Sequence, residues 1–417
     1  MDNKTENKTN FYPLELRAQG FKQQLTDELT QNILHFWQTK MKDENGGFFG
    51  QMTGQNELQK SAARGGILNA RILWTFSSAA RILGNDAYKA VAEHAKNYIF
   101  DHFFDAEFGG TYWLLNADGT VADAKKQIYS QAFFIYALVE YHRLTNDAEC
   151  LEHAKELFYF IEKNSFDYQK NGYFEAYSRD WKLLDDLRLS EKDANEKKTM
   201  NTHLHILEAY SNLYRVWKDP VLEQQLQNLI LLFTDKIINQ KTYHLDLFFD
   251  EDWNSRSTLI SYGHDIEASW LIDEAALVLN KTDIIRKVRP IVLKVADAAA
   301  EGLRENGAIV NEKNTATGHI DTNCDWWPQA EAMVGYYNAY QISGNSVYLN
   351  NVLKNWTFIN KNIIDRENGE WVWAVNENGI KDLKNDKAGF WKCPYHNSRM
   401  CLELIERIAP YEDSIEK

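Results

Sequence analysis

Proline is scarce in this sequence, with six residues among 417, so few helices are forced to break. The four cysteines are widely spaced and form no CxxC pair, which argues against a disulfide framework and a cysteine-rich zinc site. No run of about 18 apolar residues occurs, so no membrane span is expected. The polar N-terminus MDNKTENKTN also lacks the apolar core of a signal peptide. Together these features predict a reduced, cytoplasmic protein.

Basic residues are also fewer than acidic ones, which gives the chain a net charge of −14 at pH 7. Nucleic acids and anionic membranes both favour basic surfaces, so we expect neither as a partner. Hydrophobic residues make up 44% of the chain, which is enough for a large core. The 13 Trp, 21 Tyr and 21 Phe mildly favour a sugar ligand, although a large helical core uses the same residue types.

Helical periodicity dominates the rest of the sequence. Apolar residues recur at i, i+3, i+4 and i+7 in segments such as 26–41, 87–104 and 221–238. Short strand-like segments follow glycine or turn residues, and they start at residues 46, 109, 171, 244, 307 and 369. The intervals of 63, 62, 73, 63 and 62 residues leave room for two helices in each repeat.

Six helix pairs, each with one amphipathic and one more buried helix, predict an all-α toroid, the (α/α)6 barrel. Short β-hairpins would line one mouth of this ring. An open α-solenoid would also show helix-pair repeats, but irregular repeats without a strict consensus favour closure. No Pro/Gly/Ser-rich linker divides the chain. We therefore predict a flexible lead-in at residues 1–15 and a single catalytic domain at residues 16–417.

Polar or aromatic residues recur in the early turns of the six more buried helices. They are Arg71, Tyr129, His205, His264, Trp327 and His396. If these helices run parallel, the side chains meet at one mouth, where helix N-termini favour negative charge on substrate oxygens. Each residue could instead belong to the core, and Arg71 could form a buried ion pair. The shared spacing favours a common site.

Two local patterns refine this hypothesis. His264 and Glu267 are three residues apart on one helix face and can form a hydrogen bond, although a solvated ion pair is the alternative. His203 and His205 point to different sides of their helix, and the apolar pattern does not decide which of them faces the mouth.

A zinc site is a further alternative. His264, Glu267, Cys393 and His396 could supply ligands, because H-x-x-E and C-x-x-H place ligands on common faces. The stronger HExxH and paired CxxC signatures are absent, so we expect no metal.

The motifs around these residues resemble the cellobiose 2-epimerases of the N-acylglucosamine 2-epimerase superfamily, from about residue 20 to residue 410. The motifs are LNARILWTF, DANEKKTMNTHLHILEAY, GHDIEASWL, WWPQAEA, GEW and GFWKCPYHNSRMC. Ser398 stands where that family is expected to have glycine. The resemblance implies an (α/α)6 barrel without metal or nucleotide cofactor. It also implies reversible C2 epimerisation at the reducing-end glucose of β-1,4-linked disaccharides, from cellobiose to glucosyl-mannose and from lactose to epilactose.

The resemblance also implies residue roles. His264 and His396 would be the acid/base pair, and His205, rather than His203, would assist ring opening or hydrogen-bond the open chain. Arg71 would stabilise the enediolate oxygens, and Glu267 would orient His264. The residues expected to hold the reducing-end sugar of the disaccharide substrate are Tyr129, Asn201, Trp327, Trp391 and Asp193.

The chemistry of C2 epimerisation fits these residue types. The C2 hydrogen is acidic only in the open-chain aldehyde, and its removal gives a cis-enediolate whose charge needs a nearby cation. Return of the proton on the opposite face calls for two bases, and imidazoles with a pKa of about 6.5 serve near neutral pH. The alternatives are a mannose 2-epimerase or mannose isomerase, a glycoside hydrolase with two essential carboxylates, and a non-catalytic sugar-binding toroid. We expect a monomer or a weak homo-oligomer.

Overall fold

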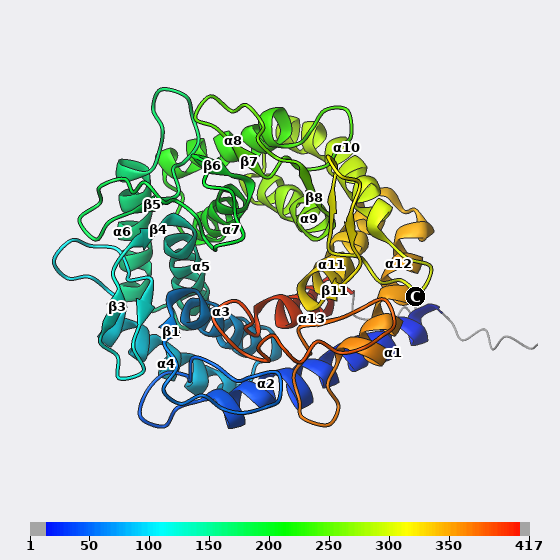
Figure 1. Ribbon diagram of the computed structural model, residues 1–417, viewed down its shortest axis with the longest axis horizontal. Coiled ribbons are helices and arrows are strands. Elements are labelled where there is room, and N and C mark those ends of the chain that lie inside the picture. Colours follow the sequence, from blue (N-terminus) through cyan, green and yellow to red (C-terminus); the bar gives the residue numbers. More distant parts are fainter. Residues whose placement is uncertain (1–13, 409–417) are drawn as a thin grey trace, which may run out of the picture.

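The computed structural model describes residues 14–408. Within this range the helices form a ring, with one layer around the centre and a second layer on the perimeter (Figure 1). Residues 1–13 of the predicted lead-in at residues 1–15 lie outside the described residues. Helix α1 begins at Leu14, two residues before the predicted start of the domain.

The inner layer of the described range contains six helices, each packed against the next. Contacts run from α3 through α5, α7, α9 and α11 to α13, and α13 returns to contact α3. This last contact closes the ring, so the predicted (α/α)6 barrel is confirmed and the open solenoid is excluded. The inner helices are α3 (Gly66–Leu83), α5 (Ile128–Thr145), α7 (Met200–Val216), α9 (Tyr262–Leu279), α11 (Trp326–Ser343) and α13 (Tyr395–Arg407).

The outer layer consists of the amphipathic helices, which bury their apolar faces against the inner ring. None of the helices in residues 14–408 is long and apolar enough to cross a membrane. The outer elements are α1 (Leu14–Asp27), η1 (Glu28–Ile33), α2 (Leu34–Phe36), η2 (Trp37–Met41), α4 (Asp86–His102), α6 (Ala148–Asn164), α8 (Pro220–Leu232), η3 (Phe233–Ile237), α10 (Thr282–Ala299), η4 (Ala300–Gly302), α12 (Ser346–Phe358) and η5 (Ile359–Ile363).

Inner helices pass into outer helices through short turns. Helix α3 ends at Gly84, which adopts a left-handed conformation, and the side chain of Asn85 then caps α4. Gly344 and Asn345 form the same turn between α11 and α12. Because these connections are short, the long connections all lie at the other end of the ring.

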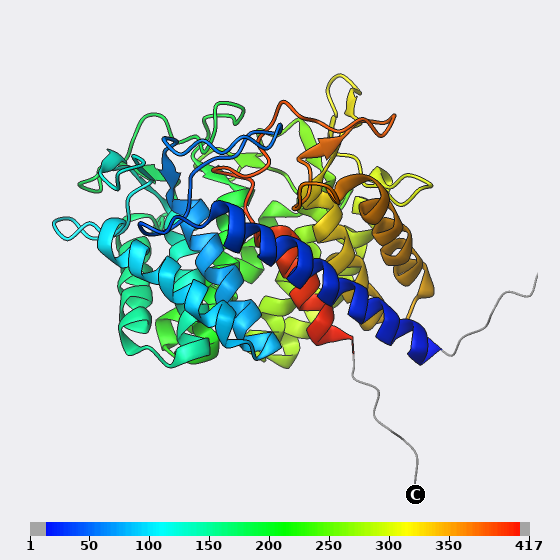
Figure 2. The ribbon, with the colours of Figure 1, turned by 90° about the horizontal axis from the view of Figure 1, so that it is seen from below.

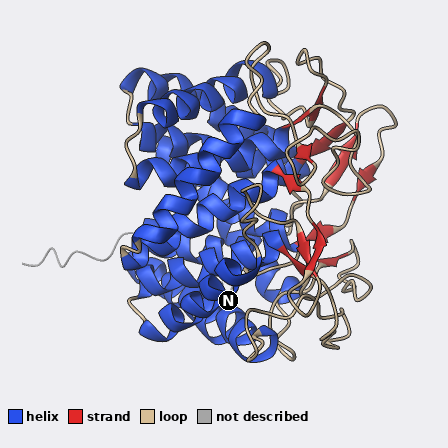
Figure 3. Cartoon of the chain, turned by 90° about the vertical axis from the view of Figure 1, so that its left-hand side faces the viewer, coloured by secondary structure: helices blue, strands red, loops and turns tan. Residues whose placement is uncertain are grey.

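The strands lie together at that other end, which we call the strand end (Figures 2 and 3). A strand before one inner helix pairs with a strand after the next outer helix, giving β1–β2, β4–β5, β6–β7, β8–β9 and β11–β12, and a Met52–Ala388 bridge occupies the sixth position. The strands are β1 (Arg64–Gly65), β2 (Leu114–Leu115), β3 (Val121–Asp123), β4 (Lys126–Gln127), β5 (Ala176–Tyr177), β6 (Lys198–Thr199), β7 (Phe248–Phe249), β8 (Leu259–Ser261), β9 (Glu312–Asn314), β10 (Ile320–Asp321), β11 (Cys324–Asp325) and β12 (Ala374–Val375).

Buried ion pairs hold the strand end in four of the repeats. Each joins an aspartate that follows an outer helix to a basic residue just before the next inner helix. The pairs are Asp43–Arg64, Asp105–Lys126, Asp167–Lys198 and Asp365–Lys387.

Removal of one of these cations is expected to destabilise the fold. The Lys198 ammonium donates to Asp167 Oδ2 at 2.7 Å and to two backbone carbonyls, and both side chains are buried. Lys198→Met leaves Asp167 buried without its counter-charge, so we expect the free energy of unfolding to fall by about 3–5 kcal/mol. Urea denaturation measures this loss, and adding Asp167→Asn is expected to recover much of it. A single variant as stable as the native chain would contradict the prediction.

Candidate active site

Histidines in the N-terminal turns of α7, α9 and α13 share one hydrogen-bonding pattern. Each contacts the protein through Nδ1, and none of the three Nε2 atoms has a hydrogen-bond partner within residues 14–408. The contacts are His205 Nδ1 to Glu208 Oε2 at 2.9 Å, His264 Nδ1 to Ser261 Oγ at 2.8 Å, and His396 Nδ1 to Glu331 Oε1 at 2.7 Å. A carboxylate only accepts, so Nδ1 of His205 and His396 carries hydrogen and Nε2 is a free base.

His203 has a different environment from these three. Its Nδ1 donates to the Thr199 carbonyl at 2.6 Å, and its Nε2 accepts from the Tyr173 amide at 2.9 Å. Burial lowers the pKa of His203 to about 4, so the ring stays neutral. His203 therefore binds a hairpin, whereas His205 belongs to the group with a free Nε2.

Trp327 packs beside two of the histidine rings. Its ring centroid is 4.7 Å from that of His264 and 5.7 Å from that of His396. Trp326 is buried and packs against Trp373 at 4.6 Å. Of the two adjacent tryptophans, only Trp327 is therefore placed beside the histidines, as predicted from the resemblance.

Arg71 is a buried cation without a carboxylate partner. Its guanidinium donates to the Tyr129 hydroxyl at 2.8 Å and lies 4.2 Å from the Phe133 centroid and 4.6 Å from the Tyr395 centroid. Only 2% of the residue is exposed, and no carboxylate of the described chain lies within 4.0 Å of it. The ion-pair alternative is therefore wrong, and the charge of Arg71 is available to a bound anion.

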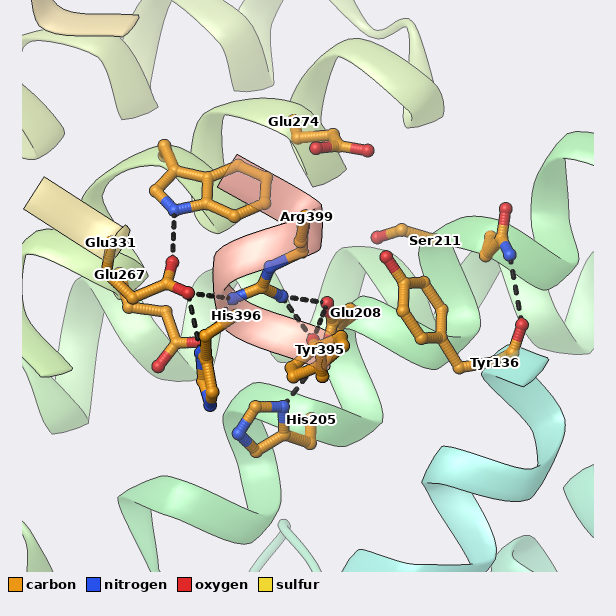
Figure 4. Close-up of polar contacts among 12 residues, drawn as sticks. Tyr136, His205, Glu208, Ser211, Glu267, Glu274, Glu331, Tyr395, His396 and Arg399 are labelled. Carbon is orange, nitrogen blue, oxygen red and sulfur yellow. Dashed lines mark hydrogen bonds and ion pairs between the residues drawn. The ribbon is translucent and has the colours of Figure 1, made fainter. Parts of the chain in front are cut away.

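A second buried arginine, Arg399, binds three glutamates at the centre of the site (Figure 4). One guanidinium nitrogen donates to Glu267 and Glu331, both at 2.6 Å, and the other bonds Glu208 and the Tyr395 hydroxyl. We call Glu208, Glu267 and Glu331 the carboxylate cluster. Three acidic groups against one guanidinium favour the binding of a proton.

Two glutamates of the carboxylate cluster have opposite pKa shifts. Burial, followed by the charge of Glu331, raises the pKa of Glu267 to about 8. Burial also acts to raise the pKa of Glu208, but Arg399 and His205 outweigh it and lower that pKa to about 2. Near neutral pH, Glu208 is therefore a carboxylate and Glu267 a carboxylic acid.

Comparison with known proteins agrees with this geometry. The sequence profile described as N-acylglucosamine 2-epimerase (GlcNAc 2-epimerase) matches residues 47–399.

The chain belongs to the N-acylglucosamine 2-epimerase family.

Its relatives confirm the predicted resemblance and make the chain an epimerase, an isomerase-class enzyme. The cellobiose 2-epimerase of Bacteroides fragilis is 56% identical over 385 residues, which cover 92% of this chain and 98% of the relative. That of Ruminococcus albus is 41% identical over 92% of this chain and 98% of the relative. The solved cellobiose 2-epimerase of Bacillus thermoamylovorans has a TM-score of 0.90 at 42% identity, and the match covers 93% of this chain and all of that one.

The predicted hydrogen bond between Glu267 and His264 is wrong in this epimerase. The Glu267 carboxyl is bound to Arg399 and lies 4.0 Å from His396 Nδ1, whereas His264 contacts Ser261. The two residues do occupy one helix, but the Arg399 cation draws the carboxyl to the ring centre. The imidazole turns instead towards the end of β8.

The four residues of the alternative zinc site do not converge in the epimerase. Cys393 Sγ accepts from Arg71 at 3.8 Å instead of joining the histidines. Glu267, Glu331 and His396 do offer ligand atoms within 4.8 Å of one another. The Arg399 guanidinium already occupies the oxygens of both glutamates, so these donors fit a guanidinium better than a metal ion.

The remaining predicted sugar-binding residues lie in different settings. Asn201 Oδ1 is buried and has no hydrogen-bond partner in the described part of the chain, and the Trp391 ring is 6.1 Å from that of Tyr129. Asp193 instead accepts from the Ser190 amide and hydroxyl at 2.9 and 3.1 Å. Its carboxylate therefore supports its own loop.

Four residues of the site were missed in the sequence, and the repeat register offers a signal for two of them, Glu331 and Arg399. Four side chains, which we call the hairpin-binding residues, accept from the preceding hairpin amide: Gln131, His203, Asp265 and Gln329. Two positions after the last three lie His205, Glu267 and Glu331. The missed residues are Glu208, Glu331, Tyr395 and Arg399.

Proposed function

We propose that this epimerase interconverts C2 epimers at the reducing-end glucose of β-1,4-linked disaccharides, with cellobiose giving glucosyl-mannose and lactose giving epilactose. The observation that carries the proposal is the pair of imidazoles that pack beside Trp327, each with an Nε2 that has no partner within residues 14–408. The 56% identity to a cellobiose 2-epimerase supports cellobiose as the substrate.

Ring opening comes first, because the C2 hydrogen is acidic only beside a free aldehyde. The bond from C1 to the ring oxygen breaks, the C1 hydroxyl loses its proton, and the ring oxygen gains one. His205 moves this proton through its free Nε2 while Glu208 holds Nδ1. Tyr129, Asn201, Trp327 and Trp391 hold the sugar, and Asp193 acts through its loop.

The C2 proton then leaves on one face and returns on the other. One of His264 and His396 takes the proton, and the electron pair moves to the C1 oxygen to form the enediolate. Arg71 stabilises this oxyanion with a charge that no carboxylate within residues 14–408 pairs with. The opposite histidine protonates C2, and the C1 aldehyde reforms.

This scheme needs one proton more than two neutral imidazoles supply. Burial lowers the pKa of His264 to about 3 and also lowers that of His396, so both are neutral in the free enzyme. Glu267 carries a proton near neutral pH and lies 4.0 Å from His396 Nδ1. We assign the extra proton to Glu267 in the free enzyme and to His396 Nε2 at the step that protonates C2, because Nδ1 of His396 already donates to Glu331.

The pH profile of kcat/KM is expected to show these shifts. Because both imidazoles stay neutral, activity persists below the usual histidine pKa of about 6.5, and the acid limb lies lower. The alkaline limb lies at about 8, where Glu267 loses its proton. Unfolded histidines bind protons below about 6.5 while the folded ones do not, so the free energy of unfolding falls as the pH is lowered below about 6.5. An acid limb centred at about 6.5 would instead indicate ordinary histidines.

We further propose a metal- and nucleotide-independent enzyme whose catalytic domain is residues 16–417. The four cysteines are free and buried, which supports a cytoplasmic location. The expected state is a monomer or a weak homo-oligomer, with a disaccharide substrate and no nucleic-acid partner.

NMR of cellobiose incubated in D2O with the EDTA-treated protein tests the proposed function. Glucosyl-mannose carrying deuterium at C2 is the expected product. Glucose alone would indicate a glycoside hydrolase instead. Conversion of free mannose without change in cellobiose would keep the proton transfer but reduce the substrate to a monosaccharide, as in a mannose 2-epimerase or isomerase.

A further inference from the structure

The geometry points to Glu370 as a positioning residue that fixes the start of α13, and with it His396 and Trp391, through hydrogen bonds from three separate segments. This inference rests on the proposed function only in so far as His396 is a proton carrier. Glu370 belongs to the GEW motif and lies between η5 and β12, away from the histidines themselves.

Glu370 occupies a backbone position that suits glycine. Its φ is 63°, in the left-handed region that disfavours residues with a Cβ atom. The repeats place Gly47, Gly110 and Gly172 at the corresponding point, just before the bridged residue of the hairpin, with φ of 65°, 73° and 86°. A glutamate here is tolerated only if its side chain gains something that glycine cannot supply.

The gain is visible in the contacts of its carboxylate, which is fully buried. Oε1 accepts from the Trp371 amide at 2.8 Å, from Lys392 Nζ at 3.0 Å and from Asn397 Nδ2 at 2.6 Å. Oε2 accepts from Trp37 Nε1 at 2.7 Å. One carboxylate therefore ties the N-terminal helical segment and the last hairpin to the segment that carries the catalytic histidine.

The repeat register explains why a carboxylate is needed at this point. Gln131 and Gln329 reach the amide of their hairpins directly. The corresponding residue of α13 is Asn397, whose side chain is one methylene shorter, and it donates to Glu370 instead. Glu370, rather than Asn397, then accepts a hydrogen bond from the Trp371 amide. The Glu370 side chain therefore links the hairpin to α13.

The two residues that Glu370 holds on this segment are direct neighbours of site residues. Asn397 follows His396, and Lys392, which is fully buried and paired with Glu370, follows Trp391. Loss of the carboxylate therefore frees the backbone on both sides of the KCPYH stretch. A displacement of about 1 Å in a catalytic group can cost 10²-fold in rate.

Two variants test this role. Glu370→Gly combined with Lys392→Met restores the residue type of the early repeats and removes the strain on the backbone. Glu370→Gln combined with Lys392→Met removes both buried charges, so no ammonium is left unpaired. Glu162→Gln is the matched control, because Glu162 is a buried carboxylate that accepts from Tyr173, Tyr210 and Gln225, far from α13.

We expect both Glu370 variants to fold, to lose roughly 10²-fold in kcat on cellobiose and to raise KM, with a shift of the His396 ring signals in NMR spectra of the full chain. The control is expected to lower only the unfolding temperature. Folded Glu370 variants with native kcat and unshifted His396 signals would overturn the inference. If the native chain leaves cellobiose unchanged, the proposed function fails, and the His396 signals alone decide the role of Glu370.

Discussion

Replacing His264 with glutamine is expected to stop conversion between the two epimers while one epimer still exchanges its C2 hydrogen with solvent. If each histidine serves one face of C2, His396 can still remove and return a proton on its own face. We expect epimerisation to fall roughly 10²–10⁴-fold, the usual contribution of a general acid–base group. Proton NMR in D2O, started separately from cellobiose and from glucosyl-mannose, follows exchange and conversion together.

The variant His396→Gln is expected to give the reverse pattern, with exchange in the other epimer. His203→Gln is the matched control, because Gln131 and Gln329 already occupy the corresponding hairpin-binding positions, so this substitution preserves the hairpin contact. It is expected to leave both exchange and conversion intact. Exchange of the same epimer in both single variants would contradict the assignment of one histidine to each face.

The fold was predictable because its information is local and repeats along the chain. The predicted segments starting at 46, 109, 171, 244, 307 and 369 correspond to bridged residues Phe48, Thr111, Tyr173, Leu245, Ile309 and Trp371. Apolar periodicity places the helices, and glycine or asparagine ends several of them. The strands are shorter than the predicted segments, because the left-handed residues at each hairpin limit pairing to two or three residues.

The candidate site was only partly predictable, because its members follow several registers. Arg71 and His205 occupy one position of the repeat, whereas His264 and His396 lie three residues earlier in the same register. A search for one polar or aromatic residue in the early turns of each inner helix selected His264 in α9 and His396 in α13. It missed Glu331 and Arg399, which continue the register of Arg71.

Contacts between side chains that are distant in the sequence could not be predicted from the repeat register. Glu267 and Arg399 are 132 residues apart, and only the closure of the ring by α13 brings them to 2.6 Å. His264 and Glu267 are three residues apart in the sequence. This spacing permits a hydrogen bond between them but does not ensure that it forms. A buried guanidinium donates a stronger hydrogen bond to the Glu267 carboxyl than a neutral imidazole on the same helix can, so the tertiary contact prevails.

The two buried arginines are expected to respond oppositely to replacement by methionine. Arg71→Met removes a cation that pairs with no carboxylate, so the free energy of unfolding is expected to stay level or rise. Its kcat is expected to fall roughly 10²–10³-fold, because the enediolate oxygen loses its counter-charge. Steady-state kinetics and urea denaturation of the same preparation measure the two effects.

Arg399→Met instead leaves the carboxylate cluster without its guanidinium. We expect the free energy of unfolding to fall by about 3–5 kcal/mol, as for other buried charges that lose a partner. Arg399→Lys is the control, because it keeps the charge but cannot reach all of Glu208, Glu267 and Glu331 in one plane, and an intermediate loss is expected. If Arg71→Met were the unstable variant and Arg399→Met the inactive but stable one, the roles of oxyanion partner and structural cation would have to be exchanged.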